Sequence, residues 1–126
     1  MQIMKEGLTY TSTTVVNKTN TAVALGSGDM EVFATPAMVA LMENAAMKAV
    51  ADYLEEDQTT VGSEINTTHI KPSALGATIS ATAILSSVEG RKLTFLVAAR
   101  DNHGVIGEGT HTRFVVSRER FLSKLL

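Results

Sequence analysis

The fold is decided by residues 32–46, VFATPAMVALMENAA, which predict the one long helix of the chain. Thr35 is a good N-cap because its hydroxyl can accept from a free helical N–H, and Pro36 suits the first helical position. Apolar side chains then recur at helical spacing as far as Leu54. Because the first turns are apolar almost all round, we expect a buried helix rather than a surface helix.

Downstream of Thr59 the hydrophobic period changes to two, which is typical of β-strands. We expect four strands, at Val61–Lys71, Thr78–Val88, Lys92–Arg100 and Val105–Ser117. The turns between the last three strands are short and contain Gly, which predicts an antiparallel meander.

Two shorter segments precede the helix. Leu8–Val16 is rich in Thr and Val and predicts a strand, and Thr21–Leu25 is consistent with a second short strand. Residues 26–29, GSGD, predict a loop. One long apolar helix combined with long strands predicts an α+β fold, in which a curved antiparallel sheet wraps a central helix.

Size limits where a substrate can bind. The chain has 126 residues and a mass of 13.4 kDa, which predicts a single domain over residues 1–126. A domain of this size hides only about two-thirds of its chain surface on folding. A large substrate therefore needs a cleft between subunits, or most of the core.

Charge and cysteine content exclude several classes of protein. A net charge of -2 and a pI near 5.9 give no positive field for nucleic acid or an anionic membrane. The absence of Cys excludes disulfides, thiolate nucleophiles and cysteine-ligated metals, and fits a reducing compartment. Met1–Val16 lacks a signal-peptide pattern, and Phe33–Val50 is too short and too charged to span a bilayer. We expect a cytoplasmic protein.

The order of a strand, a buried helix and four long strands resembles the hotdog fold of acyl-CoA thioesterases and dehydratases. Residues 32–46 resemble the helix entrance of the fluoroacetyl-CoA-thioesterase-like branch, where a Thr begins the helix, a Glu lies two turns further in and a His follows on the next strand. In this chain they are Thr35, Glu43 and His69, and the resemblance covers about residues 10–117. It implies that these three residues are catalytic and that acyl-CoA lies at the interface of a homodimer.

Glu43 has a functional and a structural interpretation. It lies among apolar neighbours on the predicted helix, where an ionised carboxylate loses hydration and is stabilised by pairing or by protonation. A carboxyl group in such a place suits general acid–base work. The alternative is that Glu43 is partly exposed, or pairs with Lys48 or with an Arg of another chain.

The start of the helix also has two interpretations. Thr35 is expected to cap it, while the free N–H groups and positive dipole of a helix N-terminus can stabilise the oxyanion formed from a thioester carbonyl. Because Pro36 has no N–H, we expect the amides of Ala37 and Met38 to be the donors, beside the Thr35 hydroxyl.

His69 is expected on an alternating strand, where a lone His is commonly a hydrogen-bonded structural residue. If it approaches Glu43, the pair can share a proton and deprotonate a water molecule. Thr35 and Glu43 are eight residues apart, so their backbones are separated by about 12 Å along a helix. The site is therefore bridged by substrate, linked through His69, or assembled from two chains.

Further substrate contacts are expected at Phe33, Gly62 and Arg113. Phe33 is the aromatic residue nearest the helix entrance, and Gly62 matches a strand glycine of the resembled branch, which permits close approach of a ligand or forms a simple bulge. The resemblance places Arg113, in residues 109–114 (GTHTRF), near the CoA channel, so it is the preferred contact for a CoA phosphate. Other basic candidates are Lys71, Arg91, Lys92, Arg118 and Arg120.

Together these features predict a thioesterase that hydrolyses a small acyl-CoA to a carboxylate and free CoA, with no separate cofactor. No metal site is expected, because His69, His103 and His111 lack HxxxH spacing. Residues 26–30, GSGDM, lack the aromatic cover that fluoroacetyl-specific members carry, so we expect a generic short-chain acyl-CoA. The alternatives are a non-catalytic acyl-CoA-binding or sensor module, and a hotdog hydratase or dehydratase.

Overall fold

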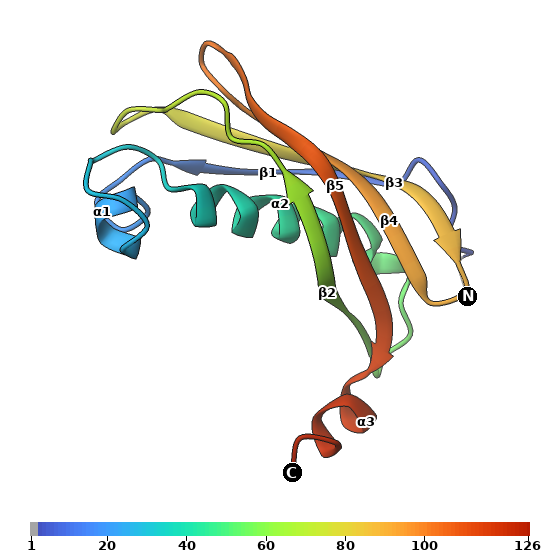
Figure 1. Ribbon diagram of the computed structural model, residues 1–126. Helices are drawn as coiled ribbons and strands as arrows, with labels where there is room; N and C mark the ends of the chain where they lie inside the picture. Colours follow the sequence, from blue (N-terminus) through green and yellow to red (C-terminus); the bar gives the residue numbers. More distant parts are fainter. Residues whose placement is uncertain (1–2) are drawn as a thin grey trace.

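One long helix, α2 (Thr35–Val50), lies in the concave side of a curled sheet in the computed structural model, which describes residues 3–126 (Figure 1). The side chains that α2 buries are Met38, Met42, Ala45, Ala46, Ala49 and Val50. The helix is shorter than predicted, because a 3-10 turn, η1 (Ala51–Tyr53), replaces its last turn. The first two residues of the Met1–Val16 segment, and of the predicted 1–126 domain, lie outside the described residues.

The sheet has five antiparallel strands in the order β1-β3-β4-β5-β2. Their bounds are β1 (Thr9–Val15), β2 (Gln58–Thr67), β3 (Thr78–Glu89), β4 (Lys92–Asp101) and β5 (Gly104–Ser117). The predicted meander of the last three strands is confirmed, and β1 and β2 form the two edges. A central helix wrapped by a curved antiparallel sheet is therefore the observed architecture.

The core fills the space between α2 and the inner face of the sheet. Inward positions on β3 and β4 alternate with outward ones, as the pleat of a strand requires. The fully buried inward residues include Ala81, Ala83 and Ala99, whose small side chains leave room for the helix. Larger side chains, such as Phe95 and Leu93, fill the remaining volume.

The predicted short strand at Thr21–Leu25 is wrong, because this segment forms a one-turn helix, α1 (Ala22–Leu25). The Thr21 side chain accepts from the Ala24 amide at 3.2 Å and caps the turn. Gly26 ends it in the left-handed conformation, with φ of 71°. Local capping thus overrides the strand propensity of Thr and Val.

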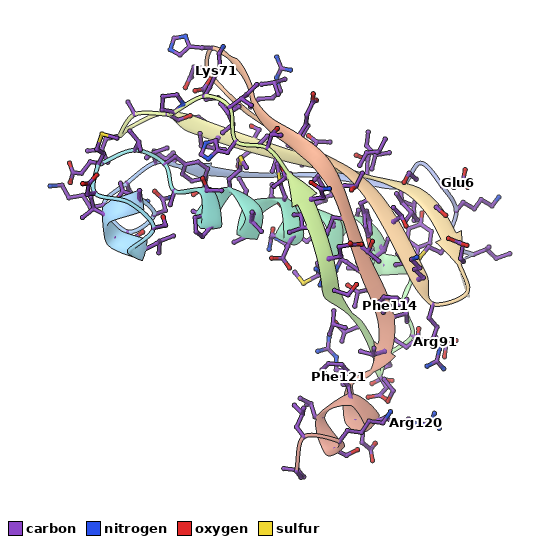
Figure 2. The ribbon with its side chains drawn as sticks, in the orientation of Figure 1. Glu6, Lys71, Arg91, Phe114, Arg120 and Phe121 are labelled. Atoms are coloured by element: carbon purple, nitrogen blue, oxygen red, sulfur yellow. The ribbon has the colours of Figure 1, made fainter. Side chains whose placement is uncertain are left out.

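At the other end of the chain, α3 (Arg118–Ser123) follows β5 and extends away from the sheet. Figure 2 shows Arg120 and Phe121 on this helix, and the Phe121 side chain is exposed. Across residues 3–126, none of the helices has the length and apolar character needed to cross a membrane.

Candidate active site

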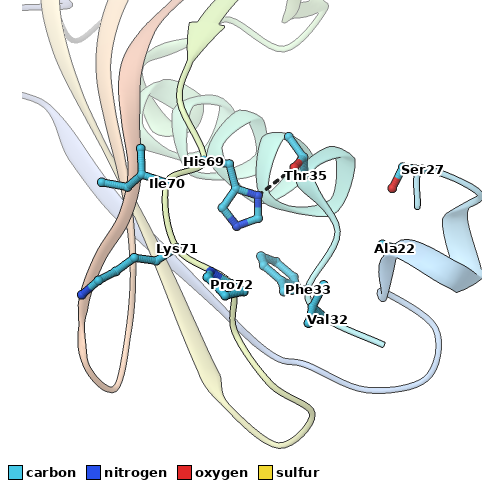
Figure 3. Close-up of a pocket in the computed structure, with 9 residues that line it drawn as sticks. All are labelled: Ala22, Ser27, Val32, Phe33, Thr35, His69, Ile70, Lys71 and Pro72. Carbon is cyan, nitrogen blue, oxygen red and sulfur yellow. Dashed lines mark hydrogen bonds between the residues drawn. The ribbon is translucent and has the colours of Figure 1, made fainter. Parts of the chain in front are cut away.

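The first candidate site is at the N-terminus of α2, where Phe33, Thr35 and His69 form what we call the entrance cluster (Figure 3). Thr35 Oγ1 lies 2.7 Å from His69 Nδ1. The buried Phe33 ring packs edge-on against the imidazole, with ring centroids 6.5 Å apart. The cluster lines a cavity of about 280 Å³, and Lys71 lies on its rim. The structure therefore brings two of the three predicted catalytic residues together.

The start of α2 differs from the prediction in one respect that matters for chemistry. Ala34, not Thr35, is the N-cap, and no side chain caps the helix. The Met38 amide donates to the Ala34 carbonyl at 3.0 Å, so it is not the free donor that we expected. The Ala37 amide has no main-chain partner among the described residues and stays available to an oxyanion. The Thr35 hydroxyl, relieved of capping, bonds to His69 instead.

His69 does not lie on a strand as predicted, because β2 ends two residues earlier, at Thr67. The chain bends over β5 at this point, and Gly109 on β5 permits the close crossing. A Cβ at position 109 would overlap the carbonyl oxygen of Asn66, so any other residue would push the two segments apart. This bend carries His69 to Thr35.

The surroundings of His69 determine its proton state. Burial lowers the pKa of the imidazole, and the main chain of Lys71 opposes this shift. Its Nε2 is buried and has no hydrogen-bond partner among the described residues. The ring is therefore neutral near pH 7, and its Nδ1 accepts from the Thr35 hydroxyl or donates to it, depending on the tautomer. A hydroxyl hydrogen-bonded to a neutral imidazole is the geometry of an activated or proton-relaying pair.

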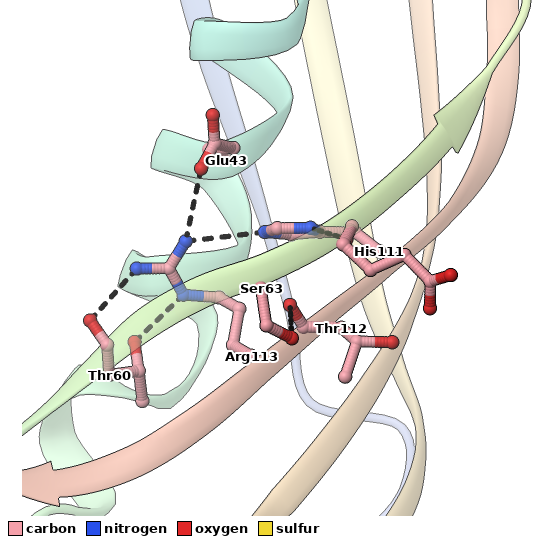
Figure 4. A network of polar contacts seen from close by, with 7 residues as sticks. Glu43, Thr60, Ser63, His111, Thr112 and Arg113 are labelled. Carbon is pink, nitrogen blue, oxygen red and sulfur yellow. Dashed lines mark hydrogen bonds and ion pairs between the residues drawn. The ribbon is translucent and has the colours of Figure 1, made fainter.

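The second candidate site lies further along α2, where Glu43, Thr60, His111 and Arg113 form what we call the arginine network (Figure 4). Arg113 donates from Nε to Thr60 Oγ1 at 2.8 Å and from Nη2 to the Thr60 carbonyl at 2.9 Å. Its Nη1 lies 3.2 Å from His111 Nε2 and 3.6 Å from Glu43 Oε2. The guanidinium is thus held on three sides.

Glu43 and Arg113 differ sharply in exposure. The Glu43 side chain is 41% exposed, whereas that of Arg113 is 7% exposed. Glu43 is therefore partly exposed, as the structural alternative proposed, and it pairs with an Arg of its own chain. Burial lowers the pKa of the Arg113 guanidinium, and Glu43 opposes this shift. The guanidinium of Arg113 contacts Thr60, His111 and Glu43 of its own chain. Its expected contact with a CoA phosphate stays a prediction.

Gly62 explains how the carboxylate reaches the guanidinium. A Cβ at position 62 would lie 2.7 Å from Glu43 Oε2 and 3.2 Å from Arg113 Nη1. The strand is also irregular here, because the β2–β5 register shifts between Gly62 and Glu64. The bulge alternative is confirmed, and the group that approaches Gly62 closely in this chain is the Glu43 side chain.

The two clusters are separate within one chain. Among the described residues no hydrogen bond or ion pair joins Glu43 to Thr35 or His69. Linkage of the predicted catalytic set through His69 is therefore wrong for a single chain, and bridging by substrate or assembly from two chains remain. Nor do three or more His, Asp or Glu side chains in this part of the chain gather where they could share a metal ion.

Thr60 and His111 are the two residues of the network for which the sequence predicts no site role. His111 lies two residues before Arg113 on β5, so both side chains face inward. The alternation of His and Arg within residues 109–114 was the available signal.

Comparison with known proteins supports the resemblance seen in the sequence. Residues 16–119 match the model of a family described as fluoroacetyl-CoA-specific thioesterase, FlK. A fluoroacetyl-CoA thioesterase from Streptantibioticus cattleyicolor is 46% identical over 95 residues, which are 75% of this chain and 68% of that protein.

Solved structures agree with the fold. A Phe-to-Ala mutant of the fluoroacetyl-CoA-specific thioesterase superposes with a TM-score of 0.93 and 39% identity, over 99% of this chain and 97% of that chain. The same mutant in complex with fluoroacetate and CoA gives a TM-score of 0.87 and 40% identity, over 94% and 99% of the chains. A hot-dog-like protein from Thermanaerovibrio acidaminovorans gives a TM-score of 0.87 and 25% identity, over 95% and 89%. The predicted hotdog fold is confirmed.

Proposed function

The chain belongs to the fluoroacetyl-CoA-specific thioesterase family, and we propose that it hydrolyses a short-chain acyl-CoA to a carboxylate and free CoA. The observation that carries this proposal is the 2.7 Å contact between the Thr35 hydroxyl and His69, made in a cavity at the N-terminus of a buried helix. Donors and a neutral base meet there, as hydrolysis of a thioester requires.

The reaction adds water to the acyl carbon and breaks its bond to sulfur. We assign the Thr35 hydroxyl and the Ala37 amide to the carbonyl oxygen, where they stabilise the developing negative charge. Because the hydroxyl has a single proton, Thr35 Oγ1 then accepts from an N–H at His69 Nδ1. Glu43 either attacks the carbonyl carbon, forming an anhydride that water then cleaves, or takes a proton from the attacking water. On either route the proton that the water releases passes by way of His69 to the CoA thiolate, which leaves as the free thiol. Oxygen-18 water in a single turnover separates these roles, because label in the Glu43 carboxylate requires a covalent anhydride.

Both clusters take part only if a second chain completes the site. Thr35 and Glu43 are about 12 Å apart along one helix, too far for both to contact one carbonyl group. Both clusters adjoin β2, an edge strand that pairs only with β5 in the described chain. Edge strands present unpaired N–H and C=O groups, and a two-fold pairing of β2 with its copy would extend the sheet. We therefore propose a homodimer whose active sites lie at the interface.

Substrate contacts follow from the same geometry. Phe33 forms the wall of the cavity behind His69 and remains a proposed contact for the acyl group. Lys71 lies on the rim with an exposed side chain, and we propose it as the contact for a CoA phosphate. We assign Arg113 to holding Glu43. The residues before α2 stay exposed around Met30, which supports a generic acyl group rather than a fluoroacyl group.

Release of free thiol from a panel of acyl-CoAs tests the function. Acetyl-, propionyl-, butyryl- and fluoroacetyl-CoA are compared on the wild type and on Glu43→Gln. We expect turnover of the short unsubstituted acyl-CoAs, without preference for the fluorinated one, and its loss in the variant. Binding of acyl-CoA with no turnover would instead indicate a binding or sensor module, and hydration of an enoyl-CoA would indicate a hydratase. The cytoplasmic location stays a prediction, testable by cell fractionation.

A further inference from the structure

The proposed reaction leaves one buried titratable side chain without a role, His111. It lies on β5 opposite Phe95 of β4 and Ile65 of β2, and only 2% of its surface is exposed. The Phe95 ring lies 6.2 Å away, centroid to centroid, at an interplanar angle of 32°. An imidazole in this place needs partners for both nitrogens, because an unpaired buried polar atom is costly.

The partners of His111 determine which nitrogen carries its proton. Nδ1 lies 2.7 Å from the main-chain oxygen of Glu64, and a carbonyl only accepts, so Nδ1 is the N–H donor. Nε2 lies 3.2 Å from Arg113 Nη1, and a guanidinium only donates, so Nε2 is the bare acceptor. The neutral Nδ1–H tautomer satisfies both contacts, and no other protonation state does.

Protonation of this ring would break the contact with Arg113. An N–H at Nε2 would face an N–H of Nη1, and two positive charges would lie side by side. The charged groups that face the ring are Arg113 on its own strand and Glu43 on α2. From β2 it contacts the Glu64 main-chain oxygen, and from β4 it faces the uncharged Phe95 ring. Burial, and secondarily Arg113, lower the pKa of His111, while the Glu64 carbonyl and Glu43 oppose this.

We propose that neutral His111 is a positioning residue: it holds the Arg113 guanidinium in place and, through it, the Glu43 carboxylate. This inference rests on the proposed function of Glu43. The imidazole spans from the bulge of β2 to the guanidinium, so it ties the irregular part of the edge strand to the group that anchors the carboxylate. Protonation of His111 therefore disconnects the ring from Arg113 and loosens the guanidinium that anchors Glu43.

The first test is the tautomer, which does not depend on activity. Nitrogen-15 NMR spectra of the full chain show the imidazole signals of three histidines. The signals that are missing from the spectrum of His111→Gln are those of His111. We expect a protonated Nδ1 and a bare Nε2 from pH 8 to below pH 6.5, and a rise of the titration midpoint in Arg113→Leu. A protonated Nε2 at neutral pH, as the other tautomer or as the imidazolium, would overturn the proposal.

The second test compares two variants in thiol release. His111→Gln keeps one donor and one acceptor but does not titrate, whereas His111→Leu keeps neither. We expect His111→Leu to lower kcat about 10²-fold, the cost of a small misplacement, with KM within about threefold. His111→Gln should recover most of kcat. Its kcat should also lack the decrease at low pH that protonation of His111 causes in the wild type. If a folded His111→Leu has the same kcat as the wild type, the proposal for His111 is contradicted. If the wild type itself has no thioesterase activity, the proposed function is contradicted, and the tautomer test of His111 remains valid.

Discussion

The entrance cluster and the arginine network lie along the same helix but differ in how completely their polar groups are satisfied. In the entrance cluster Thr35 is exposed, an open cavity adjoins it, and His69 Nε2 has no partner among the described residues. In the arginine network the buried guanidinium of Arg113 contacts Thr60, His111 and Glu43. The first arrangement can receive a ligand, while the second holds one carboxylate still.

This difference assigns the work of the site. Incomplete groups next to a cavity gain partners when substrate binds, so their binding energy is available to the reaction. The polar groups of the arginine network already have partners, so they form no new hydrogen bonds when substrate binds. They instead fix the Glu43 side chain before binding, which lowers the entropy cost of placing it at the substrate. Glu43 combines the two, since it is anchored to Arg113 on one side and 41% exposed on the other.

The largest effect is expected from Glu43→Gln, which removes the reacting group and keeps its size. We expect kcat to fall about 10³-fold, within the range for loss of an acid–base group. Glu55→Gln, at an exposed position just before β2, is the matched control and should retain wild-type kcat. If Glu43→Gln turns over acyl-CoA at the wild-type rate, Glu43 is not catalytic and the arginine network has only a structural role.

Thr35→Ala tests the open cluster and should have the next largest effect. Loss of one donor to an oxyanion costs about 10²-fold in kcat, and we expect that loss here. Thr35→Ser keeps the hydroxyl that bonds to His69 and should recover most of the rate. Equal rates for the Ala and Ser variants would show that the hydroxyl is not used.

Gly62→Ala disturbs the closed network at its tightest point. The new Cβ would lie 2.7 Å from Glu43 Oε2, and a flexible carboxylate yields more readily than a strand. We therefore expect a fall in kcat of about tenfold with little change in melting temperature. The neighbouring exposed residue supplies the control, Ser63→Ala, whose kcat should not change. A variant that loses stability and keeps kcat contradicts this account.

Both clusters should make stability depend on pH in the same direction. Burial lowers the pKa values of His69 and His111 from 6.5, so the unfolded chain takes up protons before the folded one. The contribution of the two neutral histidines to the free energy of unfolding is therefore fully present above pH 6.5. It decreases as the pH falls toward their folded-state pKa values. Urea titrations at pH 7.5 and 5.5 measure this dependence, and His111→Gln should reduce it.

The smallest effect is expected from Lys71→Ala, on the rim of the open cluster. An exposed charge contributes little, so we expect KM to rise about two- to threefold, with kcat unchanged and the difference lost at high salt. Arg91→Ala is the control, because Arg91 lies at the opposite end of the molecule (Figure 2). Equal KM changes in both variants would remove Lys71 from the site.

Hydrophobic periodicity was sufficient to predict the helix, the four strands that follow it and the meander, because burial of apolar side chains imposes those periods. The first strand was predicted from its Thr and Val content. Prediction from the sequence failed at α1, where the Thr21 hydroxyl caps a helical turn and Gly26 ends it in the left-handed conformation. These two local features outweigh the weak strand propensity of the segment. Prediction also misplaced His69, because the bend beyond β2 depends on a glycine of another strand, Gly109, which no local pattern reveals.

The site shows the same division between local and long-range information. The sequence predicts a site role for the residues of both clusters except Thr60 and His111, whose roles depend on hydrogen bonds to Arg113 across the β2–β5 ladder and along β5. The pairing of Glu43 with an Arg of its own chain also needed the strand register. Contacts between elements distant in sequence are set by tertiary packing, which periodicity does not encode.

The central claim is that one active site joins the entrance cluster of one chain to the Glu43 of another. Two heterodimers, co-expressed with different tags and isolated by tandem affinity, test it. The first pairs Thr35→Ala with Glu43→Gln, and the second pairs the double variant with wild type. A shared site predicts about half of wild-type kcat for the first heterodimer and near-zero activity for the second, because only the first contains one intact site. The reverse result, activity in the second heterodimer alone, would contradict the account.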